Sequence, residues 1–437
     1  MERTNTAGNQ RIAELFDAGT FSEIGAYVKR PGDAGCYEGV ICGYGAIAGK
    51  LAFAFVEDSG RDKGAFDATA AEKINRLYDM AVASGAPVIG VFDSAGARIE
   101  DGSAVLSAYA GFLHAVSDAS GRVPQIALIG GVCSGLSATA ASMFDLRIGV
   151  AEKSQFYTVP GRKKSAQALY EGGTFAALCK DDAEAYAFVR RLIDWLPQNS
   201  RGEQATDDTA NMQAEVAGLS GQSLLDAIAD NGASIPLYGG VGKEILTELV
   251  RVGGRLVGAI VSDPSVDSGK LTGAGAKKAE SLVSFCNSFR IPVLTLVDCA
   301  GFSADSACAA TFGRLADTYA KADVPKVAVV TGQAYGGSAA LLASRALGAD
   351  VVFALQGAKI APMAPDAAVA FLWNDRISDT VSRESLEAEW ANTYASAEKA
   401  AEKGDVDDLI PTDELRARLT AALYMLTDKT AGAPAAR

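Results

Sequence analysis

The sequence predicts an α/β protein with two homologous halves, each built around a mainly parallel sheet. The first observation is an internal repeat, in which Ala86–Ala97 (APVIGVFDSAGA) matches Ile291–Phe302 (IPVLTLVDCAGF). A second pair follows further along each half, where Val123–Leu136 (VPQIALIGGVCSGL) matches Val324–Gly337 (VPKVAVVTGQAYGG). The third observation is that the strands in these segments are apolar throughout, which is typical of parallel sheets covered on both faces.

Each half contains the same elements in the same order. A helical pattern comes first, at Ala71–Ala83 in one half and at Ala276–Phe289 in the other. An apolar strand ending in an aspartate follows, with Asp93 corresponding to Asp298. A helix, a second apolar strand, a glycine turn and a helix of small residues complete the unit. Alternating strands and helices of this kind predict right-handed crossovers around a parallel sheet.

A polar stretch separates the two halves. It lies around Pro197–Pro236, where the run QNSRGEQATDDTANMQ contains few large apolar residues. Domain boundaries usually fall in such exposed, polar segments. We therefore expect an N-terminal domain at residues 1–225 and a C-terminal domain at residues 226–437 that ends in a helical tail.

The composition narrows the class of protein. The 437 residues are 49% hydrophobic, as in packed globular proteins, and the net charge of −13 argues against nucleic-acid binding. Seven scattered cysteines without a CxxC pair predict a reducing compartment and no metal site. The N-terminus lacks an apolar signal core, and polar residues interrupt the longest uncharged stretch, Val123–Phe144. We therefore expect a cytoplasmic protein.

The two glycine turns are the strongest functional signal. Each follows a strand and opens a helix, at the edge of the sheet where ligands of α/β proteins bind. The first N–H groups of a helix have no acceptor within the helix, and glycine lets a ligand approach the backbone closely. The candidate donors are Gly135 and Leu136 in the first half and Gly336, Gly337 and Ser338 in the second. Paired turns predict two substrate oxygens that become negatively charged during the reaction.

Two other interpretations of these segments remain open. The glycines could serve tight helix–strand packing alone, without a ligand. Gly131–Gly135 (GVCSG) also has the GxCxG form of a nucleophile elbow, with Cys133 as the nucleophile. A cysteine nucleophile usually needs a base, and the single histidine, His114, lies within a helical pattern. A cysteine-dependent hydrolase is therefore a lesser alternative.

With both turns placed, the chain resembles the carboxyltransferase subunits of biotin-dependent acyl-CoA carboxylases and decarboxylases. The resemblance runs nearly end to end. The segments that carry it are Arg11–Ile24, Ala86–Gly102, Pro325–Gly337, Phe353–Ala367 and Ala391–Leu409. It implies a crotonase-like fold in both halves, arranged as tandem domains related by duplication.

The resemblance also implies an active site without a side-chain base. By position, the N–H groups of Gly135 and Leu136 would hold the enolate of a CoA thioester, and those of Gly337 and Ser338 the ureido oxygen of biotin. Tyr335, Gly336 and Ala340 are expected beside them, on the biotin side. Acyl-CoA is expected to bind mainly to the first domain, and biotin to the second domain of a partner chain.

The resemblance further implies partners. No biotin attachment motif or ATP-binding carboxylase region is recognisable, so we expect a separate biotin carboxyl carrier protein and a biotin carboxylase or membrane decarboxylase subunits. A site shared between chains implies a dimer-based homo-oligomer, with a hexamer as one form. Leu136 stands where the family usually has a second glycine, and the family's substrate loop after Gln155 is missing. These departures leave open a non-catalytic member that binds CoA or partner subunits.

Overall fold

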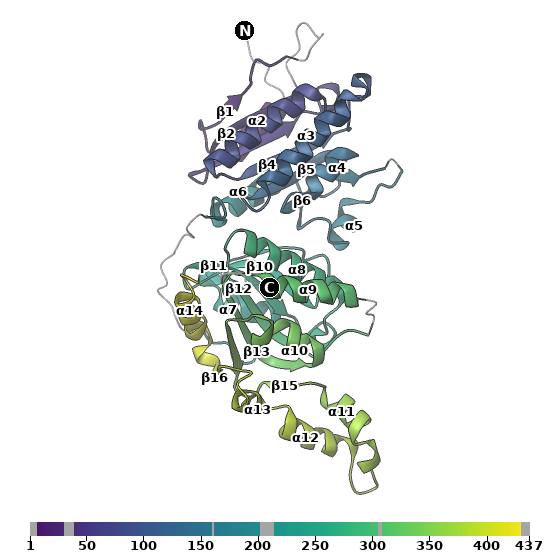
Figure 1. Ribbon diagram of the computed structural model, residues 1–437, viewed down its shortest axis with the longest axis vertical. Helices are drawn as coiled ribbons and strands as arrows, with labels where there is room; N and C mark the ends of the chain where they lie inside the picture. Colours follow the sequence, from purple (N-terminus) through teal and green to yellow (C-terminus); the bar gives the residue numbers. More distant parts are fainter. Residues whose placement is uncertain (1–6, 30–38, 160, 202–213, 305–307, 430–437) are drawn as a thin grey trace, which may run out of the picture. The chain divides into compact units, whose positions relative to one another are not determined.

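The computed structural model describes residues 7–29, 39–159, 161–201, 214–304 and 308–429. The chain divides into two compact units, Met1–Gln204 and Ala205–Arg437 (Figure 1). The division lies before the boundary expected at residue 225, because Leu224 and Leu225 pack into the core of the second unit.

The first unit is built on an eight-stranded sheet of order β1-β2-β3-β4-β5-β6-β8, with β7 paired to the end of β5. The first three strands are antiparallel and the rest are parallel. The strands are β1 (Ser22–Ile24), β2 (Val40–Ile47), β3 (Lys50–Glu57), β4 (Val88–Ser94), β5 (Gln125–Ser134), β6 (Leu146–Val150), β7 (Gln155–Tyr157) and β8 (Ala177–Cys179).

Helices cover this sheet and complete its core. They are α1 (Ala7–Leu15), α2 (Ala68–Ser84), α3 (Ala104–Ala119), α4 (Leu136–Ser142), α5 (Ala166–Glu171) and α6 (Asp182–Trp195). Helix α2 begins where the Asp67 side chain accepts the N–H of Ala70, and it ends at Gly85 with a left-handed backbone. Helices α2 and α3 lie side by side and bury Leu77 and Phe112 with the strands (Figure 1). Helices α1 and α6 contact each other and the sheet.

The second unit repeats the first strand by strand. Its sheet has the order β16-β14-β13-β12-β11-β10-β9, with β15 paired to the end of β13. The strands are β9 (Ser234–Pro236), β10 (Ile245–Val252), β11 (Arg255–Ser262), β12 (Val293–Cys299), β13 (Lys326–Tyr335), β14 (Val351–Leu355), β15 (Lys359–Ala361) and β16 (Asp408–Ile410). The internal repeat seen in the sequence is therefore a repeat of the whole sheet.

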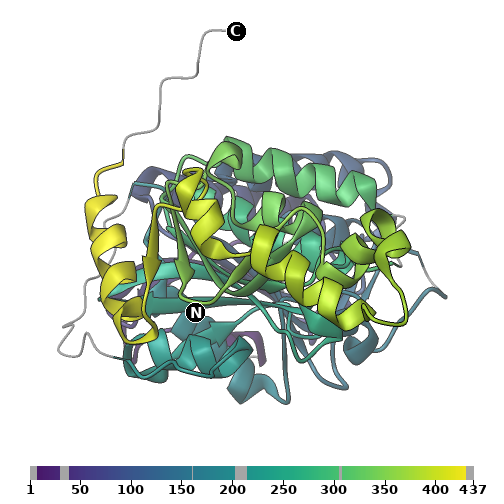
Figure 2. The same ribbon diagram turned by 90° about the horizontal axis from the view of Figure 1, so that it is seen from below.

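The helices of the second unit include extra elements near the C-terminus. They are α7 (Gly221–Ile228), α8 (Gly273–Ser288), α9 (Ala309–Lys321), α10 (Gly336–Leu342), α11 (Pro365–Leu372), α12 (Arg383–Tyr394), α13 (Ala397–Glu402) and α14 (Leu415–Met425). Helices α11 and α12 pack against each other (Figure 2). The expected helical tail thus also contains strand β16. In the described parts of the chain, no helix is long and apolar enough to span a membrane.

A bulge opposite an aspartate occurs at the same place in both sheets, with Asp93 buried and Asp298 half-buried. In the first unit Phe92 pairs with Ile129 and Ser94 pairs with Cys133, so residues 130–132 lie opposite Asp93 alone. Oδ1 of Asp93 accepts the N–H of Val132 at 3.2 Å. The aspartate thereby satisfies a backbone donor that the bulge removes from the ladder.

The second unit contains the same bulge. Residues 331–333 lie opposite Asp298, whose Oδ1 accepts the N–H of Gln333 at 3.0 Å. A glycine is needed beside each aspartate. A Cβ at Gly131 would lie 2.0 Å from Oδ1 of Asp93, and one at Gly332 would lie 2.4 Å from Cγ of Asp298.

We predict that Gly332→Ala destabilises the protein by about 1–3 kcal/mol, because the new methyl group overlaps the Asp298 carboxyl. The matched control is Gly313→Ala within helix α9, where a Cβ meets nothing within 4 Å. This change is expected to stabilise the helix by about 0.5–1 kcal/mol. Urea unfolding of the two variants measures both effects. Equal stability of the two variants would contradict the role assigned to Gly332.

Candidate active site

The first glycine turn joins β5 to α4. Gly135 has a φ of 60° and a ψ of −127°, a backbone conformation that favours glycine. Its N–H donates to the carbonyl of Tyr157 at 3.0 Å, within the pairing of β5 with β7. The expectation that Gly135 supplies a donor to a substrate therefore needs correction, because its N–H is already used. Leu136 is the first residue of α4, so its N–H has no acceptor within that helix.

The second glycine turn joins β13 to α10 in the same register. Tyr335 pairs with Ala361 of β15 as Ser134 pairs with Tyr157 of β7. Gly336, with a φ of 63°, therefore stands in the place of Gly135. It follows that Gly337 corresponds to Leu136, and Ser338 to Ser137.

The side chains around the second turn have different exposures. The Gly337 backbone is exposed, as is Ala340 further along α10. Ser338 is buried, and its hydroxyl donates to the carbonyl of Tyr335 at 2.8 Å. Tyr335 is also buried, in a small core with Leu386 and Trp390. Its ring therefore stabilises the position of α10, whereas its expected contact with biotin is not evident in this unit.

At each glycine turn, the residue after the glycine differs in size between the two units, and so does a residue in the loop that follows the preceding strand. A Cβ at Gly337 would lie 2.3 Å from Cε2 of Phe302, and the Phe302 ring stacks on Phe312 with centroids 4.3 Å apart. Ala97 takes the place of Phe302 in the first unit, since each forms the same bridge after the bulge strand. The large side chain thus comes from Phe302 in one half and from Leu136 in the other. The leucine at position 136 leaves its N–H unchanged.

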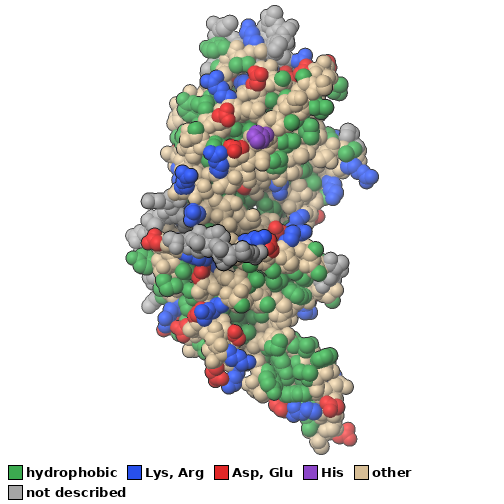
Figure 3. Space-filling model, viewed as in Figure 1, with side chains coloured by type: hydrophobic (Ala, Val, Ile, Leu, Met, Phe, Trp, Pro, Cys, Tyr) green, Lys and Arg blue, Asp and Glu red, His purple; other side chains and the backbone are tan. Residues whose placement is uncertain are grey.

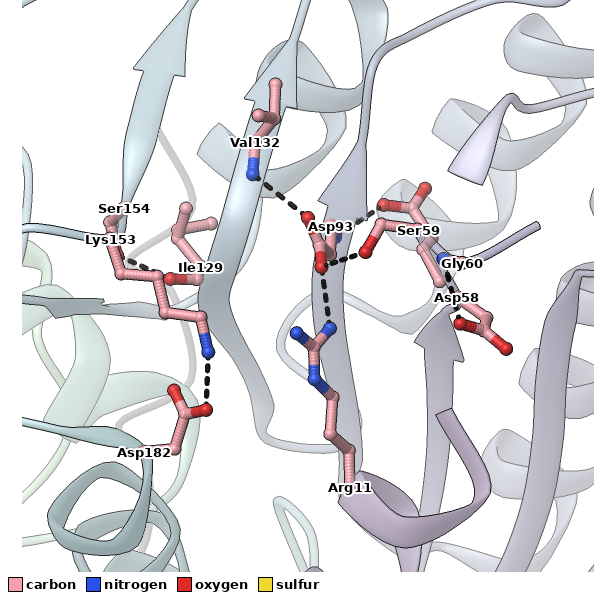
Figure 4. Close-up of polar contacts among 11 residues, drawn as sticks. Arg11, Asp58, Ser59, Gly60, Asp93, Ile129, Val132, Lys153, Ser154 and Asp182 are labelled. Carbon is pink, nitrogen blue, oxygen red and sulfur yellow. Dashed lines mark hydrogen bonds and ion pairs between the residues drawn. The ribbon is translucent and has the colours of Figure 1, made fainter. Parts of the chain in front are cut away.

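An ion pair supports the bulge behind the first turn. Oδ2 of Asp93 accepts Nη1 of Arg11 at 2.7 Å and Oγ of Ser59 at 2.6 Å. Figure 4 shows Arg11 reaching from α1 to Asp93, whose other oxygen faces Val132. Sequence reasoning missed Arg11 and Ser59, because neither belongs to the repeated segments.

A second carboxyl group is buried beside Asp93. Oε2 of Glu57 accepts the N–H of Asp93 at 3.1 Å, and its Oε1 has no hydrogen-bond partner among the described residues. Burial raises the pKa of Glu57 to about 8. The hydrogen bond from the Asp93 N–H lowers this pKa, and the negative charge of the Asp93 carboxylate raises it. Glu57 is therefore largely neutral at pH 7, which leaves the charge of Arg11 to balance Asp93.

The cysteine interpretation is not supported by the structure. Cys133 lies within strand β5 rather than at the apex of the turn, and it is fully buried. Burial raises the pKa of the Cys133 thiol well above its usual value, so a thiolate nucleophile is disfavoured. His114 is exposed on α3. Within the described ranges, no group of three or more His, Cys, Asp or Glu side chains could hold a metal ion.

We predict that Glu57→Gln changes how stability depends on pH. Between the ordinary pKa of 4.5 and the folded value of about 8, the native protein keeps a proton that the unfolded chain has released. The wild-type protein therefore loses stability as the pH rises through this window, by up to ~1.4 kcal/mol per pH unit from this group. Urea unfolding of both proteins at pH 6, 7 and 8 should show the Glu57→Gln variant gaining stability relative to the wild type as the pH rises. A difference independent of pH would contradict the neutral state of Glu57.

Comparison with known proteins agrees with this geometry. A family model described as the carboxyl transferase domain matches residues 2–437. Methylmalonyl-CoA decarboxylase subunit alpha of Propionigenium modestum is 33% identical, over 98% of this chain and 91% of the relative. The methylmalonyl-CoA carboxyltransferase 12S subunit of Propionibacterium freudenreichii subsp. shermanii is 31% identical, over 100% of this chain and 92% of the relative.

A solved structure extends the comparison to the fold. Transcarboxylase 12S, described as a hexamer with methylmalonyl-coenzyme A and methylmalonic acid bound, superposes with a TM-score of 0.92 at 29% identity. The match covers 98% of this chain and 91% of the transcarboxylase. Together with the repeated sheet order, it confirms the expected crotonase-like fold of the two halves. Sequence, fold and paired glycine turns agree, and this chain belongs to the carboxyl transferase domain family.

Proposed function

We propose that this chain is the carboxyltransferase subunit that moves a carboxyl group between carboxybiotin on a carrier protein and a short acyl-CoA. The observation that carries the proposal is the pair of equivalent glycine turns, each presenting a main-chain N–H at the start of a short helix. The relatives named for methylmalonyl-CoA and propionyl-CoA support a short acyl group. The same site serves carboxylation and decarboxylation.

On the acyl-CoA side, the donor is the N–H of Leu136. Removing or adding a carboxyl group next to a thioester places negative charge on the thioester oxygen. A fixed amide donor stabilises that charge without having to reorient during the reaction. Gly135 contributes the left-handed turn that exposes the next peptide, while its own N–H stays bound to Tyr157.

On the biotin side, the donors are the N–H groups of Gly337 and Ser338. Biotin supplies a ureido group that carries the carboxyl unit and accepts a proton in exchange. The residues fit such a group, because Gly337 leaves its backbone exposed and any side chain there would meet Phe302. The buried Ser338 hydroxyl fixes the turn by donating to Tyr335. This chain's part is to bind and orient the ureido oxygen and to stabilise charge on it.

The surface supports assembly with further copies or subunits. Large apolar side chains are exposed over α11 and α12 and the loop between them, where Figure 3 shows hydrophobic groups gathered. These include Phe371, Leu372, Ile377 and Tyr394, exposed by 77%, 57%, 36% and 54%. Apolar patches of this kind mark interaction surfaces. We expect a homo-oligomer that receives the biotin carrier protein, consistent with the hexamer described for transcarboxylase 12S.

A non-catalytic role is less well supported than it was from the sequence alone. It was motivated by Leu136, which replaces a family glycine, and by the missing substrate loop after Gln155. Ala97 stands in the position of Phe302, so the first unit lacks the ring that a side chain at position 337 would meet. Apart from the missing loop after Gln155, no feature of the described residues favours the non-catalytic role.

We predict that Leu136→Pro lowers the turnover of malonyl-CoA or methylmalonyl-CoA with free biotin by about 10²–10³-fold, because it deletes the N–H. Proline is compatible with the first position of a helix, so the fold should persist. Leu136→Ala is the matched control, which keeps the N–H and should stay within about ten-fold of the wild-type kcat/KM. Equal losses in the two variants would contradict the donor role. Absence of biotin-dependent turnover by the wild-type protein with any short acyl-CoA would contradict the proposed function.

We predict a second effect at the biotin turn. Gly337→Ala should lower kcat/KM for biotin on the order of 10–100-fold, because its methyl group and the Phe302 ring cannot both keep their places. Adding Phe302→Ala should restore much of the activity, since the pair then resembles Leu136 beside Ala97. Steady-state kinetics of both single variants and of the double variant measure this coupling. A double variant no better than Gly337→Ala would contradict the packing explanation.

A further inference from the structure

We infer that Arg11 is a positioning residue for the β5–α4 turn at Gly135 and Leu136, which we call the acyl-CoA turn. Arg11 holds Asp93, Asp93 holds the backbone N–H of Val132, and Val132 in turn fixes the peptide that follows Gly135. The catalytic consequence rests on the proposed function. The effect of Arg11 on the backbone of the turn can be measured on the protein without substrate, so it can be tested separately from the effect on catalysis.

Helix α1 is firmly placed before Arg11 extends from it. Ile12 and Leu15 are fully buried, and the helix contacts β2, β3 and α6. The Arg11 side chain is 19% exposed and that of Asp93 is 10% exposed, so their 2.7 Å ion pair is largely shielded from water. Such a charge-assisted hydrogen bond is stronger than a neutral one and fixes both side chains.

Asp93 connects Arg11 to strand β5, which leads into the turn at Gly135. Its Oδ2 binds Arg11 and Ser59, while its Oδ1 accepts the N–H of Val132. Val132 belongs to the bulge, where β4 offers no regular partner, while Gln155 of β7 pairs with Val132 on its other side. Three residues later the chain enters Gly135. A carboxyl that rotates away from Arg11 would therefore release the bulge and the peptide that it positions.

The second unit serves as an internal comparison. Asp298 accepts the N–H of Gln333 in the same way, but in the described part of the chain it has no ion pair with an arginine or lysine. The neighbouring carboxyl is also missing, because Ser262 ends β11 where Glu57 ends β3. At the bulge of the first unit, two carboxyl groups lie together and Arg11 pairs with one of them. At the bulge of the second unit, the described residues include one carboxyl group, that of Asp298, without a paired cation. The dependence on an arginine is thus specific to the acyl-CoA turn.

The first test is hydrogen exchange measured by mass spectrometry on the full-length protein without substrate. Arg11→Met should speed exchange at least about five-fold in peptides covering residues 132–142, and leave peptides covering residues 333–342 at the wild-type rate. The matched control is Arg190→Met. Arg190 binds the Leu15 carbonyl at 2.8 Å and Asp17 at 2.6 Å, so it ties the end of the same helix without touching Asp93.

The inference is overturned if Arg11→Met leaves residues 132–142 unchanged, or if Arg190→Met loosens them equally. If Arg11→Met does not fold, Arg11→Lys replaces it. This variant keeps the charge but shortens the reach, and it should still raise exchange selectively at residues 132–142. In an Asp93→Asn background, Arg11→Met should add little, because the two residues act in one chain of contacts.

Kinetics then connect the exchange result with catalysis. Arg11→Met should lower kcat/KM for the acyl-CoA on the order of ten-fold or more, while the KM for free biotin stays at the wild-type value. An equal loss toward both substrates would overturn the assignment to the acyl-CoA turn. If the wild-type protein does not turn over acyl-CoA but the exchange pattern is as expected, the proposed function fails while the mechanical inference stands.

Discussion

An aspartate at the end of one strand holds the bulge of the next, and the rest of each glycine turn depends on this contact. The bulge turns the strand so that it ends in a left-handed glycine followed directly by a helix. Asp93 and Asp298 replace the missing ladder partner by accepting a backbone N–H. Glycines 131 and 332 are required because the carboxyl occupies the space of a side chain. The same local solution occurs twice, as expected for a duplicated unit.

This construction suits a reaction that needs fixed electrostatic stabilisation rather than a basic side chain. Main-chain amides have no protonation state to adjust, and their positions are set by the fold around them. Sequence differences between the halves are then tolerated if the N–H remains in place. Two equivalent pairs of positions illustrate this. The first unit has the large Leu136 and the small Ala97, and the second unit has Gly337 and the large Phe302, while both turns keep a glycine with a positive φ.

The repeated parts of the structure could be predicted from the sequence. Apolar strands ending in Asp93 and Asp298, and glycine turns ahead of small-residue helices, define the sheet edge and the turns, and the fold and family follow from them. Contacts between distant or short segments could not be predicted. Arg11 meets Asp93 across 82 residues of sequence. The use of the Gly135 N–H by Tyr157 depends on β7, which is only three residues long.

Tyr335 shows a different limit. Its position beside the turn suggested a ligand contact, but α11 and α12 supply the apolar residues that bury its ring. The burial of a side chain depends on which elements pack over it, and an aromatic residue next to a glycine turn gives no local sign of that. The division between the two units, by contrast, falls within the polar stretch Pro197–Pro236 that the sequence indicated, and only the bound at residue 225 missed that α7 packs in the second unit.

The most direct test of the account is a structure of the protein with a CoA thioester analogue that resists hydrolysis. If the Leu136 N–H is the donor, the thioester oxygen lies about 2.7–3.1 Å from the backbone nitrogen of Leu136, with Gly135 still bound to Tyr157. An oxygen held by a side chain instead, or placed away from the β5–α4 turn, would contradict it.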